Sequence, residues 1–331
     1  MNRRSAESNG KGRVAVIGAP TVEGVRVRDA LVSAGVPGSR IDLYGTTRGE
    51  VLLSEYAGEA RMIQEPVLEE IAEHEIVFIC EECEVSRRIV SVAAADCLII
   101  DLVDCLPADA QRRRVRLDVD PDIDRPGAGG CFVVPHPLTL LIAGVLQPLE
   151  REIGVAEAMA VVIRPAADFG EPGLEELREQ TIRLLRFAEL PTETFGRQLA
   201  FNVIPQTQLA GLDPGVESRI AAETTELLGW NEPRLGVRLL AAPIFHGHGA
   251  QMHFRPSVDV SLERVISVLR EAGLLGEGET AATPLEAESR ISLSDVAGDG
   301  LGGYWLWVVA GEAEARGAEQ AVRFAASLRL L

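Results

Sequence analysis

Short apolar runs alternate with helix-like stretches over the first 150 residues. RVAVIG at 13–18 precedes VEGVRVRDALVSAG at 22–35, whose apolar positions recur mostly at helical spacing. Similar apolar runs stand at 41–45, 75–80, 97–102 and 131–135, and a helix is expected at 86–95. Runs that are buried on both faces and separated by helices predict an α/β fold with a doubly wound, mostly parallel sheet.

The pattern changes after the helix that is expected to end near Ile153. Strand-like runs follow one another with fewer helices between them, and they lie at 158–166, 200–206, 236–247, 250–256 and 304–309. Longer helices are expected at 174–190 and 261–273, and a final helix at 312–331. Consecutive strands without intervening helices predict a second, α+β domain with a mixed or antiparallel sheet.

Composition and net charge limit the classes of partner that the protein can bind. The chain has 331 residues, a hydrophobic share of 47% and a formal net charge of −18. That charge repels phosphate groups and anionic membrane surfaces, so we expect no nucleic acid and no membrane partner. The first dozen residues are polar and read as a flexible tail, so we expect a soluble, cytoplasmic protein.

Two motifs contain metal-ligating residue types. Cys80 and Cys83 form a CxxC, but no second pair stands at zinc-ligand spacing, so metal or redox work is not expected there. His246, His248 and His253 cluster in PIFHGHGAQMH without a carboxylate at a recognisable spacing. We expect no metal site, and a hydrogen-bonded histidine or a general acid or base at a strand end remains open.

Two strand-to-helix junctions contain residue types that matter for binding. IGAPTVEG places Gly18, Thr21 and Gly24 at the three positions of a GxxGxxG-like turn, which can direct helix N–H groups at a pyrophosphate. At the second junction, PHPLT stands between an apolar run and a long apolar helix. Junctions of this kind often carry a nucleophile, and Pro137 has neither a nucleophilic side chain nor an N–H.

GAPTVEG, CFVVPHPLTLLIAGVLQPLEREIGV, GLEELREQT, AFNVIPQ, PIFHGHGAQMHF, ATPLEA and YWLWVV, in this order, resemble the aspartate-semialdehyde dehydrogenase family from about Arg13 to the C-terminus. The resemblance implies an NAD(P)-binding Rossmann domain at 13–137, completed by the helix at 313–331. It also implies an inserted α+β domain at 138–312 that forms a homodimer, with 1–12 as the tail.

The resemblance also implies an altered active site. The family's nucleophilic cysteine, in NPNCST, falls on Pro137, and its active-site glutamine falls on Arg164. The arginine that grips the substrate carboxylate falls on Ala241, and the catalytic histidine is kept as His248. Proline cannot form the covalent thioester, and without the arginine a carboxylate loses a charge-assisted bidentate partner.

The cofactor positions implied by the resemblance are Gly18, Ala19, Thr21, Val22, Gly24 and Arg48. The hydroxyl of Thr21 can donate a hydrogen bond to a phosphate. Glu81, Glu82 and Glu84 of CEECE replace small residues of the family and are expected near the dinucleotide, whose phosphates they would repel. NADP binding is therefore expected to be weak.

The sequence favours a regulatory, scaffolding or small-ligand-binding homodimer without dehydrogenase activity. A small anionic ligand is the expected partner. The alternative is an oxidoreductase, isomerase or lyase that acts on a different anionic substrate through His248 and Arg164. A structural subunit that pairs with an authentic dehydrogenase is the third interpretation.

Overall fold

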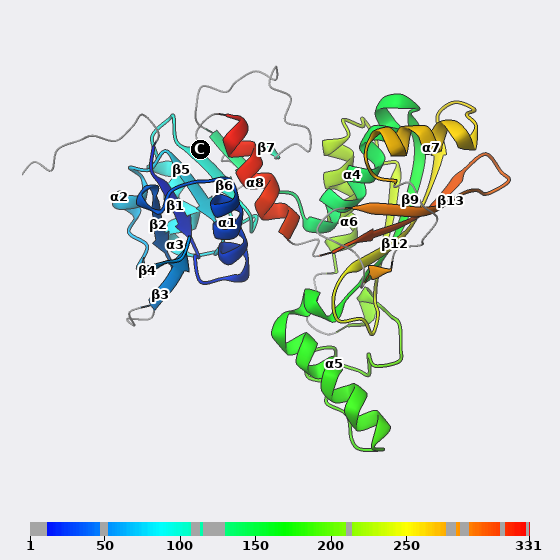
Figure 1. Cartoon of the computed structure of the whole chain (residues 1–331), viewed down its shortest axis with the longest axis horizontal. Helices are drawn as coiled ribbons and strands as arrows, with labels where there is room; N and C mark the ends of the chain where they lie inside the picture. The colour runs from blue at the N-terminus through cyan, green and yellow to red at the C-terminus, as the bar shows by residue number, and fades with distance from the viewer. Residues whose placement is uncertain are drawn as a thin grey trace, which may run out of the picture. The chain divides into compact units, whose positions relative to one another are not determined.

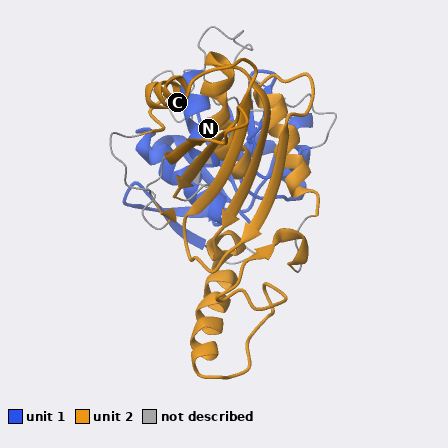
Figure 2. Ribbon diagram, turned by 90° about the vertical axis from the view of Figure 1, so that its right-hand side faces the viewer, with its two compact units in different colours: residues 1–135, 315–331 blue, residues 136–314 orange. Residues whose placement is uncertain are grey.

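The protein is described by a computed structural model, which covers residues 12–46, 52–106, 113–114, 130–209, 214–275, 283–284, 291–311, 315–328 and 331. The chain divides into two compact units (Figure 2). Unit 1 consists of residues 1–135 and 315–331, and unit 2 of residues 136–314. Each unit contains its own sheet (Figure 1).

Unit 1 contains the doubly wound sheet that the apolar runs predict. Its parallel strands, in spatial order, are β2 (Ile41–Tyr44), β1 (Val14–Ile17), β5 (Ile76–Ile79), β6 (Leu98–Asp101) and β8 (Gly130–Val133). All residues of β1, β5 and β6 are buried. The strand order reverses between β1 and β5, which is where ligands bind in open α/β sheets.

The edges of this sheet differ from the sequence expectation. An antiparallel hairpin of β3 (Leu52–Tyr56) and β4 (Glu59–Gln64) extends it beside β2, and β7 (Arg113–Arg114) pairs with β8. The predicted helix at 86–95 is shorter, because α3 (Glu84–Arg88) gives way to a single 3-10 turn at Ile89–Ser91. The β-branched residues there have low helix propensity.

Three further helices belong to unit 1: α1 (Val22–Ser33), α2 (Leu68–Ile71) and α8 (Ala315–Ser327), besides a 3-10 turn at Gly38–Arg40. The last helix of the chain, α8, returns to pack against α1. The ring of Phe324 on α8 lies 4.6 Å from the ring of Phe132 on β8. The end of the chain is thereby attached to the first domain.

Unit 2 contains a mixed six-stranded sheet. Its order is β10 (Ile204–Pro205), β11 (Leu235–Ala241), β9 (Val155–Arg164), β12 (His248–Pro256), β14 (Tyr304–Ala310) and β13 (Ser292–Gly298). Only β9 and β11 pair in parallel among these described strands. The predicted strand at 200–206 shrinks to β10, because Pro205 has no N–H for a longer ladder.

One face of this sheet packs on helices. Alternate residues of β9, including Ala158, Ala160 and Val162, share an apolar core with α4 (Pro137–Glu152), α6 (Val216–Leu227) and α7 (Leu262–Glu271). On the opposite face, Met159 is 53% exposed and Trp305 41% exposed. Of the helices that the structure describes, none is long and apolar enough to cross a membrane.

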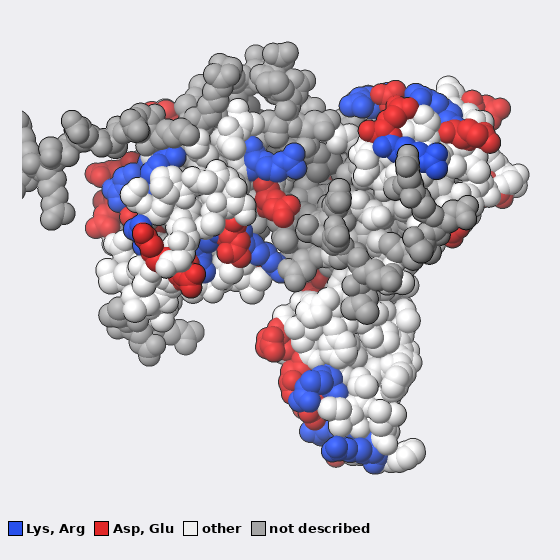
Figure 3. Space-filling view, in the orientation of Figure 1, with Lys and Arg blue, Asp and Glu red and all other residues white. Residues whose placement is uncertain are grey.

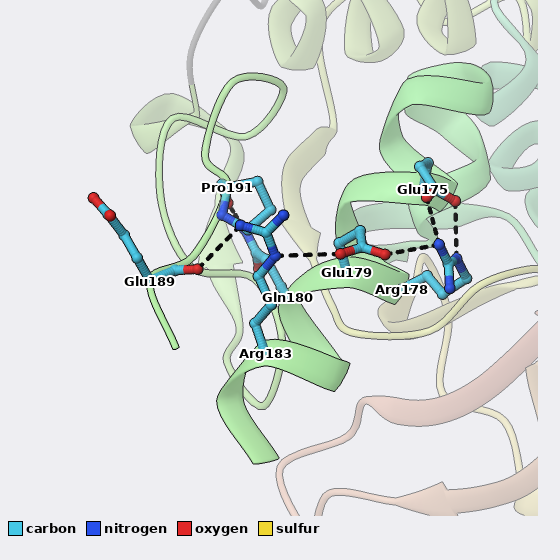
Figure 4. Close-up of polar contacts among 7 residues, drawn as sticks. All are labelled: Glu175, Arg178, Glu179, Gln180, Arg183, Glu189 and Pro191. Carbon is cyan, nitrogen blue, oxygen red and sulfur yellow. Dashed lines mark hydrogen bonds and ion pairs between the residues drawn. The ribbon is translucent and has the colours of Figure 1, made fainter. Parts of the chain in front are cut away.

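Helix α5 (Gly170–Leu185) extends away from the unit 2 sheet, as Figures 1 and 2 show. Its surface carries interspersed basic and acidic side chains (Figure 3), among them Arg178, which pairs with Glu175 and Glu179 (Figure 4). Buried Gln180 accepts the N–H groups of Leu199 and Ala200 and donates to the carbonyl of Pro191. The following loop is therefore held against the helix.

Candidate functional site

Pro137 is the first residue of α4, directly after β8 and residues 134–136. His136 is the N-cap, and its Nδ1 accepts a hydrogen bond from the N–H of Leu138 at 3.1 Å. The fixed φ of proline suits the first position of a helix, where an N–H is not needed. The apolar helix behind Pro137 thus begins with a side chain that cannot act as a nucleophile.

The backbone donors of this junction are all engaged. The N–H of His136 donates to Glu223 Oε2 at 2.8 Å, and the N–H of Thr139 donates to the carbonyl of His136 at 2.8 Å. The hydroxyl of Thr139 also donates to Glu223 Oε2, at 2.7 Å. Since Leu138 donates to His136 and Pro137 has no N–H, residues 136–139 leave no backbone donor for an oxyanion.

A buried cluster of charged side chains belongs to the same unit. Asp168, in the 3-10 turn Ala166–Phe169, accepts a hydrogen bond from Arg164 Nε at 2.6 Å and lies 2.9 Å from Nε2 of His248. The exposed fractions of these three side chains are 5% for Asp168, 12% for Arg164 and 3% for His248. Arg164 ends β9 and His248 begins β12, and these strands pair antiparallel.

The ionic state of Asp168 follows from its neighbours. Burial raises its pKa, but the positive charges and hydrogen bonds of His248 and Arg164 outweigh burial, so the pKa of Asp168 lies below its ordinary value. Asp168 is therefore a carboxylate at neutral pH. A paired, hydrogen-bonded carboxylate of this kind can be buried at tolerable cost.

Both ring nitrogens of His248 face acceptors. Nε2 lies against the Asp168 carboxylate, and Nδ1 lies 3.3 Å from the carbonyl oxygen of Gly311. Both ring nitrogens are therefore occupied by contacts within the chain.

Arg164 is only partly engaged by this cluster. Its Nη1 donates to Gln206 Oε1, and its guanidinium carbon lies 5.0 Å from the centre of the Phe169 ring. Among the described residues, Nη2 has no hydrogen-bond partner. Ala241, by contrast, lies buried in an apolar cluster with Phe195 and Leu199, so that position provides no contact for an anion.

The Gly18 turn lies in unit 1, after β1. Gly18 has a φ of +84°, and a Cβ on Gly24 would lie 2.0 Å from the carbonyl oxygen of Gly18. Thr21 caps α1 by accepting the N–H of Gly24 at 3.1 Å, and its hydroxyl donates to the carbonyls of Gly18 at 2.8 Å and Cys80 at 3.0 Å. Both glycines are thus needed by the turn itself.

These contacts correct one expectation about the turn. The single hydroxyl proton of Thr21 is already shared between two carbonyls, so it is not available to a phosphate. The N–H groups of Gly18 and Ala19 both donate to the carbonyl of Tyr44 at 2.8 Å. Within the turn and the start of α1, the N–H groups of Val22 and Glu23 remain for an anion, at a helix N-terminus that favours one.

Glu81 lies directly against this turn. A Cβ on Gly18 would come within 2.4 Å of the Glu81 Cβ, and Glu81 Oε2 is buried without a hydrogen-bond partner among the described residues. Glu82 and Glu84 point elsewhere, because Glu82 pairs with Arg87 at 2.6 Å and Glu84 with Arg88 at 3.1 Å. Of the three glutamates, Glu81 is thus the one that lies against the Gly18 turn.

The remaining candidates are placed as follows. Arg48 lies outside the described residues. Burial raises the pKa of the Cys80 thiol well above its ordinary value. The sulfur of Cys83 accepts the N–H of Ser86 and so caps α3. The described residues contain no group of three or more histidine, cysteine, aspartate or glutamate side chains that could hold a metal ion.

No family model matches the chain, but curated proteins resemble it over most of its length. The chain is 26% identical over 269 residues to the USG-1 protein homolog of Azotobacter vinelandii, and the match covers 78% of each chain. It is 24% identical over 268 residues to the aspartate-semialdehyde dehydrogenase of Rickettsia conorii, covering 79% of this chain and 78% of the relative. These matches support the resemblance of the chain to the aspartate-semialdehyde dehydrogenase family.

Solved structures of aspartate-semialdehyde dehydrogenases share the fold. Aspartate semialdehyde dehydrogenase II of Vibrio cholerae, complexed with ASA, superposes with a TM-score of 0.81 at 22% identity, over 97% of this chain and 99% of that one. The Candida albicans aspartate semialdehyde dehydrogenase with NADP gives a TM-score of 0.68 at 15% identity, over 96% and 98% of the two chains. The Rossmann-like first domain and the second sheet are thus features of the family fold.

Sequence reasoning missed three residues of the unit 2 site. Glu223 lies 87 positions from His136, and Asp168 lies 80 positions from His248, so neither contact has a local signal. His136 was passed over as part of PHPLT, although a histidine before proline at a helix start is a candidate N-cap. The alternation of β9 could have placed Arg164 near a strand end, but not its partner.

Proposed function

We propose that this protein is an aspartate-semialdehyde dehydrogenase family member that has lost the dehydrogenase reaction and binds a small carboxylate. The loss of the dehydrogenase reaction is inferred from Pro137 at the start of α4, where the backbone donors of residues 136–139 are engaged within the chain. A thioester needs a thiol at the reacting carbon, and its oxyanion needs free donors. None of these groups is available at this junction.

Carboxylate binding is supported by the guanidinium of Arg164, which lies in the buried cluster with Asp168 and His248. Arg164 Nη2 is the donor left over, and guanidinium groups bind carboxylates through charge-assisted hydrogen bonds.

Calorimetry with butanoate as the probe tests this proposal. The unmodified protein should bind butanoate, and R164Q should weaken binding about tenfold or more, since a charge-assisted hydrogen bond is lost. R178Q, on the exposed surface of α5, is the matched control and should bind as the unmodified chain does. No butanoate binding by the unmodified protein would contradict the proposal.

Proton transfer is a second candidate function, which the 2.9 Å contact of Asp168 with His248 favours. His248 can exchange a proton with a substrate once its contact with Asp168 is broken. NMR of 2-oxobutanoate in deuterated buffer tests this function through exchange of the C3 protons. Exchange that H248Q abolishes would support it, and exchange at the blank rate would exclude it for this probe.

We also propose that unit 2 forms a homodimer through the sheet face that carries Met159 and Trp305. Large apolar side chains that remain exposed on a sheet face are typical of interfaces. M159E should shift a sedimenting dimer toward monomer, while L53E, at a leucine of unit 1 that is still more exposed, should not. A monomer at micromolar concentration in the unmodified protein would contradict this.

NADP binding is proposed to be weak. The N–H groups of Val22 and Glu23 support binding of a dinucleotide phosphate, whereas the carboxylate of Glu81 opposes it.

A further inference from the structure

His253 lies on the outer face of the unit 2 sheet. Its neighbours on β12, Met252 and Phe254, belong to the apolar core, and successive residues of a strand point to opposite faces. In register with His253 are Met159 on β9 and Trp305 on β14. We call Met159, His253 and Trp305, which lie side by side across three strands, the His253 row.

One ring nitrogen of His253 is bound to a carboxylate. Nε2 lies 2.8 Å from Oδ2 of Asp299, in the turn between β13 and β14. The other oxygen of Asp299 accepts the N–H groups of Leu301 and Gly303. The hydrogen bond from His253, followed by these two, lowers the pKa of Asp299 to about 2. An ionised carboxylate only accepts hydrogen bonds, so Nε2 carries a hydrogen at neutral pH.

The other ring nitrogen, Nδ1, is buried without a hydrogen-bond partner among the described residues. The His253 side chain is 7% exposed, and the centre of its ring lies 4.6 Å from that of Trp305. While Nε2 carries the hydrogen of the neutral ring, Nδ1 is an acceptor. A buried acceptor that lacks a donor costs free energy, which a donor from another molecule can recover.

The other two side chains of the His253 row allow another molecule to reach this nitrogen. Met159 is 53% exposed and Trp305 41% exposed. Side chains on a binding surface commonly change rotamer when a partner docks. A donor that approaches the outer face can therefore contact Nδ1 once these two side chains have moved.

The surroundings of the His253 row suit a second copy of the same chain. In the next two rows of β9, β12 and β14 the outward residues are uncharged: Val161, Gln251 and Trp307, then Ile163, Gly249 and Val309. On the other side of the row, Glu157 and Arg255 pair with each other at 3.1 Å. Because the chain carries a net charge of −18, two copies meet with least repulsion over such a face.

We propose that a second copy of this chain covers the His253 row and donates a hydrogen bond to His253 Nδ1, so that the dimer weakens when this nitrogen is protonated. The inference rests on the homodimer proposed above and adds the residue that makes it depend on pH. A proton on Nδ1 turns the acceptor into a donor, which then faces the partner's donor. Asp299 stabilises the charged ring in the monomer and in the dimer, so the mismatch at Nδ1 is what separates the two states.

Sedimentation equilibrium of the full chain between pH 8 and pH 5.5 tests the inference. The dissociation constant of the dimer should rise about tenfold or more at the lower pH, the effect of one hydrogen bond lost at a buried contact. The net negative charge of the chain falls as the pH approaches the isoelectric point of about 4.8, which by itself would strengthen the dimer. A weaker dimer in acid therefore needs a specific cause.

Two variants and a control assign that cause to His253. H253Q keeps an amide donor for Asp299 and a carbonyl acceptor but does not titrate, so its dimer should not weaken in acid. D299N keeps an acceptor for Nε2 but removes the charge that stabilises the protonated ring, so the pH at which the dimer weakens should fall by about one unit or more. H246N, at an exposed histidine, should behave as the unmodified chain does.

The outcomes separate this inference from the homodimer on which it rests. A dimer whose affinity does not fall in acid would overturn the role of His253 and leave the homodimer intact. Weakening in acid that persists in H253Q, or that keeps its midpoint in D299N, would overturn that role too. A monomer at every pH would contradict both proposals.

Nitrogen-15 NMR of the histidine rings provides a second readout. At pH 8 His253 should show the Nε2–H tautomer, and its Nδ1 signal should shift as the protein concentration is raised through the dissociation constant. An Nδ1–H tautomer at pH 8 would contradict the inference whatever the dissociation constants.

Discussion

The carboxylate of Glu223 accepts the backbone N–H of His136 at 2.8 Å, across 87 positions of the chain. The same oxygen accepts the hydroxyl of Thr139, so one buried side chain of α6 holds the first turn of α4. A negative charge at a helix N-terminus also interacts favourably with the helix dipole. The chain thus supplies its own anion at this junction.

Replacing Glu223 should destabilise unit 2. E223A removes the acceptor of two hydrogen bonds to a charged group and leaves buried donors unpaired, so we expect a loss of about 3 kcal/mol in the free energy of unfolding. E223Q keeps an acceptor and should lose less. Urea unfolding measures both, and E226A, at an exposed position of the same helix, is the control. Equal stability of E223A and E226A would show that the junction does not depend on this carboxylate.

The low pKa of His136 predicts a pH dependence of stability. The pKa is about 4 in the folded protein and 6.5 without the fold, so the unfolded chain takes up the proton first as the pH falls. The contribution is complete above pH 6.5 and is lost as the pH falls toward 4, with an upper bound of about 3 kcal/mol. Urea unfolding of H136N should show a shallower decline over this window than the unmodified protein, whereas H246N should decline as the unmodified protein does. Identical slopes for H136N and the unmodified protein would contradict the buried, neutral state of His136.

The three glutamates of CEECE should affect NADP binding differently. Because Glu81 lies against Gly18 while Glu82 pairs with Arg87, E81Q should tighten NADP binding and E82Q should change it little. The unmodified chain should bind with a dissociation constant on the order of 0.1 mM or weaker. The gain in E81Q should be larger at low salt, since ions screen the repulsion. Calorimetry on the three proteins decides it, and micromolar binding by the unmodified chain would mean that Glu81 does not oppose the dinucleotide.

Local patterns predict the buried parallel strands of unit 1, because strands covered on both faces are continuous apolar runs. The hairpin of β3 and β4 was missed, since its strands mix apolar and polar residues that are mostly exposed or half-buried at the edge of the sheet. Helix α6 was missed as well, and Glu223 with it. The contacts that define the unit 2 site join residues far apart in sequence, and only the folded chain brings them together.

The side chains of the CEECE segment illustrate the same limit. The sequence places all three glutamates after β5, but it does not fix their directions. Arg87 and Arg88 on α3 draw Glu82 and Glu84 onto the surface, and the close approach to Gly18 leaves Glu81 at the turn. Ion pairs to Arg87 and Arg88 on α3 thus hold Glu82 and Glu84, and Glu81 is the one of the three that lies beside the Gly18 turn.

The most direct test of the central claim is an assay of NADP-dependent phosphorylating oxidation of aspartate semialdehyde, run on the unmodified protein and on P137C. We expect no turnover above the blank for either protein. The unmodified chain lacks the thiol. P137C would have the thiol, but its Arg164 would still pair with Asp168, and Ala241 would still lie in an apolar cluster where the family has the substrate-binding arginine. Turnover by the unmodified protein that is abolished by replacing one of its cysteines would contradict the loss of the reaction. Strong activity in P137C alone would show that the rest of the site remains that of a dehydrogenase.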